Sequence, residues 1–246
     1  MGPAVDALAT RCRVITASLP DDVLGKDGSD DPHGFDSFIR WVDGLLDGLT
    51  LKRVALCGIS YGGLVALHYA AERPQRVTSL TLASTPAPAW RPNCRVEWYL
   101  KAPRLLSLVF ALSSPVRLYP EIAAAFPNLL ARTGFALRHL HCVARYPFTP
   151  TRMADRVRRL NGVDFEGNCR RVHAPTQVVT GEPELDRVVP VEDSRAYVRT
   201  IAGAVYVQLK GTGHIGLATK PDRFADVVGS FVTAHACKRG QEVSST

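Results

Sequence analysis

The sequence lacks the cysteine patterns typical of a zinc site or a disulfide framework. Its six cysteines are far apart, with no CxxC pair and no cluster of cysteine with histidine. A zinc site needs closely spaced thiolate or imidazole ligands, and a disulfide-rich secreted domain needs dense cysteines. We therefore predict that the protein holds no metal, and the scattered cysteines fit a reducing cytoplasm.

Long apolar runs are also missing. No stretch approaches the roughly 18 consecutive apolar residues that a membrane-spanning helix needs. The first residues, Met1 to Asp6, do not combine a basic segment with an apolar one, as a signal peptide does. These absences predict a protein without a membrane span, and we expect it to be cytoplasmic.

Acidic residues are scarce in one segment only. Residues 87–171 carry 14 Lys and Arg against 5 Asp and Glu, whereas the remainder carries 16 against 18. Such a basic excess can attract an anionic substrate, an anionic membrane surface or nucleic acid, although we favour a solvated helix face. The chain has no aromatic-interleaved RNA motif, helix-turn-helix or glycine-rich phosphate loop, so we predict no nucleic-acid partner.

What is present is the alternation of strands and helices typical of an α/β protein. With 246 residues, of which 46% are hydrophobic, the chain suits one large domain or a core with an insertion. We predict a mostly parallel sheet flanked by helices. Its core comprises residues 1–86 and 172–237, with a helical insertion over 87–171 and a disordered tail over 238–246. Strands are expected at 12–16, 53–57, 77–83, 176–180 and 204–209, and helices at 38–49, 64–73 and 221–233.

A G-x-S-x-G motif lies between the strand expected at 53–57 and the helix that follows it. Its serine is Ser60, and its glycines are Gly58 and Gly62. Between a strand and a helix, this motif places a serine on a sharp, strained turn with its hydroxyl exposed. We expect a Cβ at either glycine to clash across the turn, and the helix N-terminus to offer free N–H groups to a developing oxyanion.

A serine hydroxyl is a weak nucleophile at neutral pH and needs a general base. His214 follows the strand expected at 204–209 in a Gly-x-Gly-His turn and is our candidate. The other six histidines fit better as packed or surface residues. His68 lies inside the helix after the motif, where packing is the expected role, and His139 and His141, in the helical insertion, could also line a pocket. The base in turn needs a carboxylate, and three acids follow the strand at 176–180. Asp186 lies at the tip of that loop, whereas we expect Glu182 and Glu184, nearer the strand, to be solvated.

These segments resemble the α/β-hydrolase fold superfamily. They are GISYGG with its helix, SLTLAS, TGEPELDRVVP and GTGHIGLATKPDRFADVVGSFV. The resemblance extends from residue 4 to about 235, and the order Ser60, Asp186, His214 is that of the family. It implies Ser60 as nucleophile, His214 as base, Asp186 as its orienting acid, and the backbone N–H of Tyr61 as half of the oxyanion hole. It also implies that residues 87–171 form a cap over the site.

The sequence departs from the family's pattern at two places. The loop expected after residue 16 reads Ser18-Leu19-Pro20 without the family's glycines, and the strand with the His-Gly loop that supplies the second oxyanion donor is absent. Two interpretations remain open. Either Met1 is not the native start and roughly forty to sixty residues precede it, consistent with βα unit lengths, or this is an inactive short form whose remaining strands close up.

The expected function is that of a serine hydrolase without cofactor. It would cleave an ester, thioester or similar acyl bond of a small molecule, as a carboxylesterase does, and the basic insertion is compatible with an anionic substrate. Fold does not fix chemistry. The same triad also serves acyltransferases, C–C hydrolases and cofactor-free haloperoxidases, and a non-catalytic binding protein of this fold is a further alternative.

Overall fold

The computed structural model describes residues 2–20, 34–145 and 150–242. Its centre is a parallel sheet of four strands in the order β1-β2-β3-β4. This confirms the predicted α/β class. The strands predicted at 77–83 and 176–180 have the predicted limits, and the limits of the other two differ by one or two residues. The strands are β1 (Val54–Ile59), β2 (Val77–Ala83), β3 (Thr176–Thr180) and β4 (Val205–Gln208).

The two central strands are the most deeply buried part of the sheet. All five residues of β3 and six of the seven of β2 are buried, whereas β1 and β4 are only partly covered. Apolar and β-branched runs of this length are typical of parallel strands covered on both faces. Because the strands are parallel, the loops that follow β1, β2, β3 and β4 all leave the same edge of the sheet.

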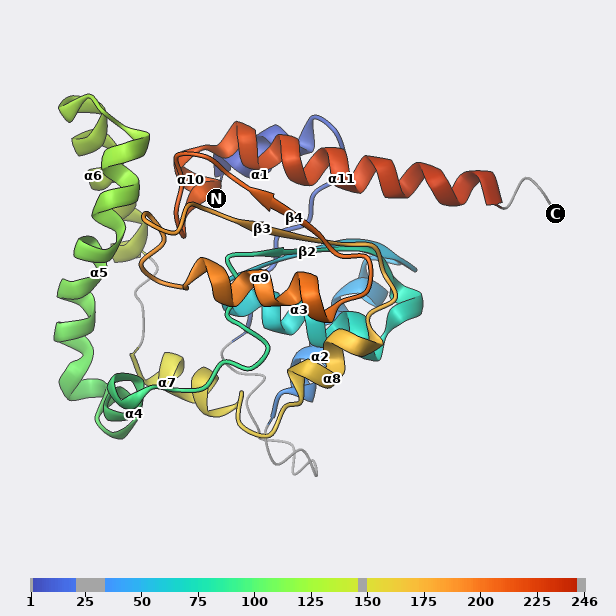
Figure 1. The fold of residues 1–246 in the computed structure, drawn as a ribbon, viewed down its shortest axis with the longest axis horizontal. Coiled ribbons are helices and arrows are strands. Elements are labelled where there is room, and N and C mark those ends of the chain that lie inside the picture. Colours follow the sequence, from blue (N-terminus) through green and yellow to red (C-terminus); the bar gives the residue numbers. More distant parts are fainter. Residues whose placement is uncertain (1, 21–33, 146–149, 243–246) are drawn as a thin grey trace.

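Helices cover both faces of the sheet (Figure 1). On one face, a large apolar cluster joins the sheet to α2, α3, α8 and α9, and on the other a smaller cluster joins it to α1 and α11. The helices of the core are α1 (Gly2–Ala9), α2 (Asp36–Gly48), α3 (Tyr61–Glu72), the short 3₁₀ helix η1 (Pro74–Arg76), α8 (Phe165–Arg171), α9 (Val191–Thr200), α10 (Gly216–Thr219) and α11 (Pro221–Glu242).

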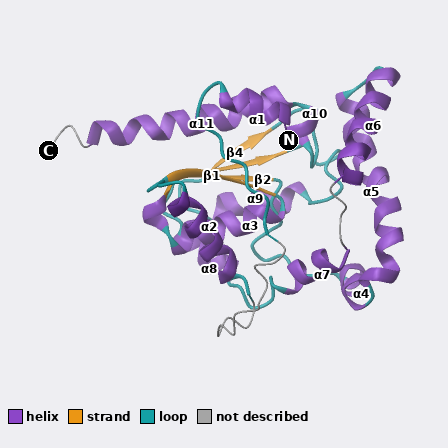
Figure 2. Cartoon of the chain, turned by 180° about the vertical axis from the view of Figure 1, so that it is seen from behind, coloured by secondary structure: helices purple, strands orange, loops and turns teal. Residues whose placement is uncertain are grey.

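Four helices are inserted between β2 and α8, within the segment for which helices were predicted. They lie at one end of the molecule, beside the sheet (Figure 2). The helix α8, which follows them, packs against α3 with Phe165 and Cys169 in the larger apolar cluster. The domain limits given above stay predictions. The inserted helices are α4 (Cys94–Lys101), α5 (Pro103–Ala125), α6 (Leu129–Arg145) and α7 (Pro150–Arg158).

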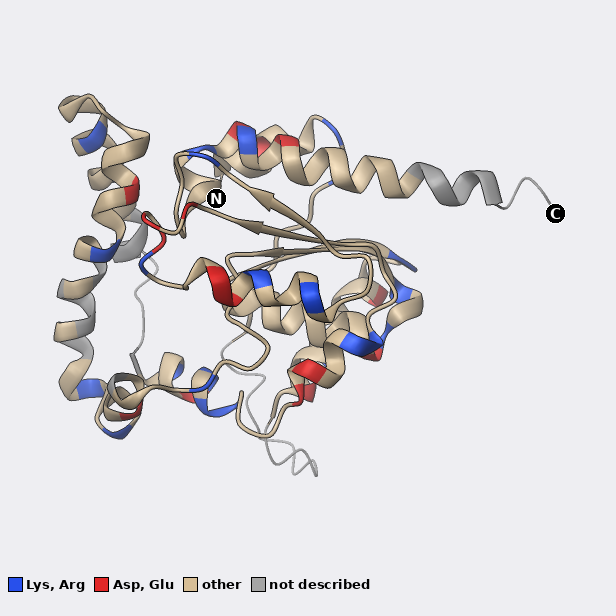
Figure 3. Cartoon of the chain, viewed as in Figure 1, with Lys and Arg blue, Asp and Glu red and all other residues tan. Residues whose placement is uncertain are grey.

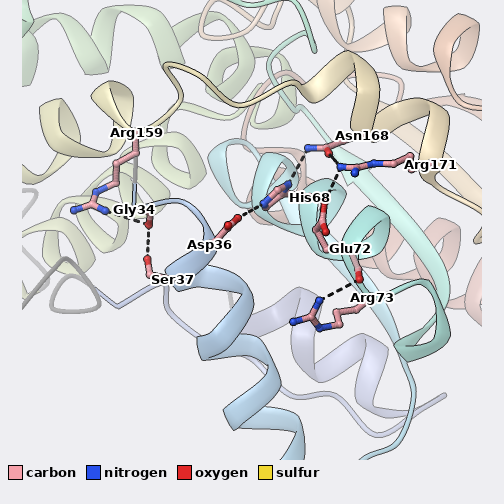
Figure 4. A network of polar contacts seen from close by, with 9 residues as sticks. All are labelled: Gly34, Asp36, Ser37, His68, Glu72, Arg73, Arg159, Asn168 and Arg171. Atoms are coloured by element: carbon pink, nitrogen blue, oxygen red, sulfur yellow. Dashed lines mark hydrogen bonds and ion pairs between the residues drawn. The ribbon is translucent and has the colours of Figure 1, made fainter. Parts of the chain in front are cut away.

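A buried histidine joins three helices of the core. Figure 4 shows His68 of α3 between Asp36 of α2 and Asn168 of α8, with distances of 2.8 Å from Nε2 to Oδ1 and 2.9 Å from Nδ1 to Nδ2. The Asn168 carbonyl oxygen accepts from Arg171, so its amide NH₂ donates to Nδ1 and the Nε2–H of His68 donates to Asp36. His68 therefore has a structural role, as its position inside a helix predicted.

Two sequence predictions about secondary structure are wrong. Residues 12–16 form no strand. A strand needs a hydrogen-bonded neighbour, and among the described residues β1 pairs only with β2, so nothing pairs with this segment. The last helix also continues to Glu242, past the predicted start of the tail at 238, because Lys, Arg, Gln and Glu are good helix formers. Residues 243–246 lie outside the described residues.

No helix in the described ranges is long and apolar enough to cross a membrane.

Candidate active site

Ser60 occupies a strained turn between β1 and α3. Its backbone has φ 53° and ψ −124°, in the left-handed half of conformational space that non-glycine residues rarely adopt. The Ser60 N–H donates to the carbonyl of Ala83 at the end of β2 (2.8 Å), and its own carbonyl accepts from the N–H of Gly63 (2.9 Å). Strain held in this way by two hydrogen bonds is typical of functional positions and is the conformation that the G-x-S-x-G motif predicts.

Two glycines allow this turn to pack, but only one of them is a glycine predicted from the motif. A Cβ on Gly58 would lie 2.5 Å from the carbonyl oxygen of Gly62, as expected. At Gly62, however, a Cβ would meet nothing within 4 Å, so the predicted clash there is wrong. The second crowded position is Gly63, where a Cβ would overlap the side chain of Thr85, because the first turn of α3 packs on the end of β2.

Tyr61 links the serine turn to the inserted helices. As the first residue of α3, its backbone N–H has no acceptor in the preceding turn and is free to face an anion. Its hydroxyl donates to the carbonyl of Arg156 in α7 (3.1 Å), and the Arg156 guanidinium lies 6.0 Å from the ring centroid. Burial raises the pKa of the Tyr61 hydroxyl, and the charges of Arg156 and Arg159 partly oppose that shift. The neutral hydroxyl thus anchors α7 beside the serine.

Of the three acids that follow β3, Asp186 is the buried one. Its side chain is 1% exposed, whereas Glu184 is exposed and Glu182 half-buried. One carboxylate oxygen, Oδ1, accepts hydrogen bonds from the backbone N–H groups of Val188 (3.0 Å) and Val189 (2.9 Å). These bonds fix the carboxylate and leave its second oxygen for another partner.

That partner is His214. Its ring Nδ1 lies 3.4 Å from Oδ2 of Asp186, and the histidine side chain is 13% exposed. The loops that carry the two residues pack without space between them, since a Cβ on Gly213 would lie 2.5 Å from the carbonyl oxygen of Leu185. The N–H of Glu182 also donates to the carbonyl of Thr212 (2.8 Å). The structure thus brings together the predicted acid and base.

Ser60 lies at the same edge of the sheet but is not bonded to the histidine. Ser60 follows β1, Asp186 follows β3 and His214 follows β4, so all three stand beyond the carboxyl ends of parallel strands, where open α/β sheets bind their ligands. Among the described residues, no hydrogen bond joins the Ser60 hydroxyl to His214. Catalytic hydrogen bonds are often long or unformed without substrate, so this geometry is compatible with either an active or an inactive site.

The other histidines are not near these residues or are already bonded elsewhere. His235 contacts the carbonyl of Phe231, and His139 stacks on Phe135 in α6. His141 and His173 are exposed, and His33 lies outside the described residues.

Glu121, which the sequence analysis did not single out, contacts the loop that carries His214. This residue of α5 is fully buried. Its carboxylate accepts from the N–H of Ile215 (2.9 Å) and from the hydroxyl of Thr219 (2.8 Å). Burial raises the pKa of Glu121, and the negative charge of Asp186 adds to that shift. Hydrogen bonds from the N–H groups of Ile215 and Gly213 and from the Thr219 hydroxyl oppose it. A signal was present in the sequence, because Glu121 is the single acid between residues 98 and 145.

A surface hollow of about 370 Å³ lies away from this site. Its lining includes Thr50, Lys52 and Arg76, which precede β1 and β2 at the amino ends of the strands. Because none of the predicted site residues lines it, we do not assign it to the reaction.

Residues 3–227 match the model of the alpha/beta hydrolase family. The chain belongs to this family. A relative from Pseudomonas syringae, named "Putative carbamate hydrolase RutD", is 28% identical over 197 residues, which are 77% of this chain and 71% of the relative. Among solved structures of the alpha/beta hydrolase fold, a bromoperoxidase from Bacillus anthracis is 19% identical with a TM-score of 0.69, over 94% of this chain and 86% of that one. An enol-lactonase from Burkholderia xenovorans is 22% identical with a TM-score of 0.61, and the match covers 81% of this chain and 73% of the lactonase.

Proposed function

We propose that this alpha/beta hydrolase is a serine hydrolase that cleaves an acyl bond of a small molecule through an acyl-enzyme. Ser60 is the nucleophile, His214 the general base and Asp186 the acid that orients the base. The observation that carries the proposal is the backbone of Ser60, with φ 53° at the turn between β1 and α3. Such strain disfavours folding unless something compensates for it, and exposing a nucleophile above the sheet is a reason for it to be kept.

In the proposed reaction, the Ser60 Oγ attacks the carbonyl carbon of the substrate while its proton passes to Nε2 of His214. The negative charge on the tetrahedral oxygen faces the backbone N–H of Tyr61. Asp186 holds Nδ1–H of the ring and stabilises the imidazolium. The imidazolium then protonates the leaving alcohol, thiol or amine, and a water activated by His214 releases the acid and restores Ser60.

The proposed substrates are esters and thioesters, and the relative from Pseudomonas syringae adds carbamates. All three present a carbonyl carbon with a leaving group, so one triad can act on each of them. The relative rates at which the protein hydrolyses an ester, a thioester and a carbamate would show which class is preferred. Acyl transfer, C–C bond hydrolysis and haloperoxidation stay alternatives on the same residues.

A second candidate is a binding protein without catalysis. The absence of a hydrogen bond between Ser60 and His214, within the described residues, favours it.

Labelling of the purified protein with a fluorophosphonate probe tests the proposal, since only an activated serine reacts rapidly. We expect labelling of the natural chain, none in Ser60→Ala, strong loss in His214→Ala, and full labelling in the matched control Ser230→Ala, whose serine is exposed on α11. If the folded protein does not react, the serine-hydrolase proposal is wrong and the binding protein is favoured. If Ser60→Ala reacts equally, another serine is the reactive one and the assignment of Ser60 is wrong.

A further inference from the structure

Exposed large apolar side chains concentrate on the inserted helices. Of the twelve such residues in the described ranges, nine belong to α4, α5 and α6. Scattered apolar residues on a surface need no explanation, whereas a concentration of them indicates a surface that contacts something other than water.

On α5 these residues form one stripe. Leu105, Val109, Val116 and Tyr119 are 79%, 57%, 66% and 56% exposed. Their spacing of four, seven and three residues places them on one side of a helix with 3.6 residues per turn. Glu121, five residues after Val116, points roughly the opposite way and is buried against the His214 loop. The helix thus has one face turned to the protein and an apolar stripe turned to solvent.

The neighbouring helix α6 repeats the pattern. It is held to the end of α5 by the stacked rings of Phe126 and Phe135, whose centroids are 4.8 Å apart. Its exposed apolar residues are Leu129, Leu130, Leu137 and Leu140, which are 72%, 82%, 62% and 63% exposed. Figures 1 and 2 show α5 and α6 together at one end of the molecule, away from the end of α11.

The charges around these stripes have a single sign. Residues 98–145 contain six Lys and Arg and one acid, the buried Glu121. No acidic residue of α5 or α6 is therefore exposed, and the charges drawn on these helices are nearly all positive (Figure 3). Lys101 and Arg138 are among the exposed cations.

We propose that α5 and α6 rest on an anionic lipid surface, with the apolar stripes in the headgroup region and the cations beside the lipid phosphates. Exposed apolar faces bordered by Lys and Arg, with Tyr at the boundary, are the pattern of helices that lie in a membrane interface without crossing it. A second copy of the chain fits less well, because pairing this face with itself would bring two positive surfaces together with no exposed acid between them.

Sedimentation of the protein with lipid vesicles tests this directly and does not depend on hydrolysis. We expect binding to vesicles of equal parts phosphatidylglycerol and phosphatidylcholine, little binding to phosphatidylcholine alone, and weakening by salt. The double variant Leu105→Gln, Val116→Gln should lose about tenfold or more in affinity, because each side chain loses apolar burial. Val205→Gln, at an exposed apolar residue of β4, is the matched control and should bind as the natural chain does.

Removal of two positive charges provides the second test. The double variant Lys101→Gln, Arg138→Gln should weaken binding by about fivefold for each cation removed. The exposed cations Lys52 and Arg199 precede β1 and β4 at the amino ends of the strands, away from the His214 loop that α5 contacts, and should be replaceable by Gln without effect. Circular dichroism establishes that each variant is folded. No binding to anionic vesicles, equal binding to neutral ones, or no effect of either double variant would overturn the proposal. So would a dimer in solution that Leu105→Gln, Val116→Gln dissociates, since a second copy would then cover this face.

Discussion

The carboxylate of Glu121, in the inserted helix α5, accepts a hydrogen bond of 2.9 Å from the backbone N–H of Ile215, the residue that follows His214. The proposed base is therefore held from two sides. Asp186 contacts its ring, and Glu121 contacts the backbone beside it and the hydroxyl of Thr219 one turn later. Because α5 lies far from the sheet elsewhere (Figure 1), this buried carboxylate is a link between the inserted helices and the candidate active site.

Replacing Glu121 should affect both stability and the site. Glu121→Ala leaves the N–H of Ile215 without its acceptor and the Thr219 hydroxyl with only its longer bond to the carbonyl of Ile215 (3.3 Å), so we expect a loss of about 1–3 kcal/mol in the free energy of unfolding. The labelling rate of Ser60 should fall about tenfold or more, because the histidine is no longer held in place. Glu121→Gln keeps an acceptor and should retain most of both. Urea denaturation and fluorophosphonate labelling measure these effects, with Glu184→Ala, at an exposed acid, as the control. Equal labelling rates in all three variants would mean that Glu121 does not position His214.

The raised pKa of Glu121 predicts a pH dependence of stability. Burial is the main cause of the shift, so the folded state retains this proton to a higher pH than the unfolded chain does. Between the ordinary pKa and the raised one, the folded state binds more protons, and the free energy of unfolding therefore falls as pH rises. Below this interval both states are protonated, and above it both are ionised.

Glu121→Gln has no such proton. The difference in the free energy of unfolding between Glu121→Gln and the natural chain should therefore shift in favour of the variant as pH rises from about 4 to about 8. Urea denaturation of both proteins across this range provides the measurement. A difference that stays constant, or that shifts toward the natural chain, would contradict the assignment.

Strands could be predicted where their own residues were enough to indicate them, and not where strand formation depends on a neighbouring strand. The strands at 77–83 and 176–180 are short apolar runs buried on both faces, and such runs can be predicted as strands from their residues alone. The segment 12–16 has the same β-branched composition, with Val14 and Ile15, but composition does not supply the adjacent strand that a ladder requires. The prediction failed there for that reason.

The same distinction applies to the site. Ser60, Asp186 and His214 follow strands that end at one edge, so motif and chain order were enough to predict that they lie on that side of the sheet. Their catalytic roles stay a prediction. Glu121 was not found, because its bond to Ile215 joins residues 94 apart in sequence, across an insertion whose placement no local pattern gives. The glycine pattern likewise did not reveal that Gly63, rather than Gly62, faces Thr85.

The two neighbouring glycines of the serine turn should respond oppositely to alanine. Gly63→Ala places a Cβ into the side chain of Thr85, so we expect a loss of about 1–3 kcal/mol in the free energy of unfolding, together with loss of labelling at Ser60. Gly62→Ala meets open space in the first turn of α3, and alanine should stabilise the helix by about 0.5–1 kcal/mol. Thermal and urea denaturation compare the pair directly. Equal destabilisation by both changes would show that the contact with Thr85 is not the determining one.

Asp186→Asn separates the charge of the acid from its structural role. The Asn side-chain oxygen can still accept from the N–H groups of Val188 and Val189, so the loop should keep its conformation and the free energy of unfolding should change little. The imidazolium formed during catalysis, however, loses its counter-charge, and the ring loses the partner that sets its tautomer. In a serine protease triad the same change lowers kcat about 10⁴-fold, and we expect a fall of about 10²–10⁴ in the rate of acyl transfer here.

The matched control is Glu182→Gln, in the same loop, which should retain the natural rate. A folded Asp186→Asn protein with an unchanged rate would exclude Asp186 as the acid and would direct attention to Glu121, the other buried carboxylate beside this loop.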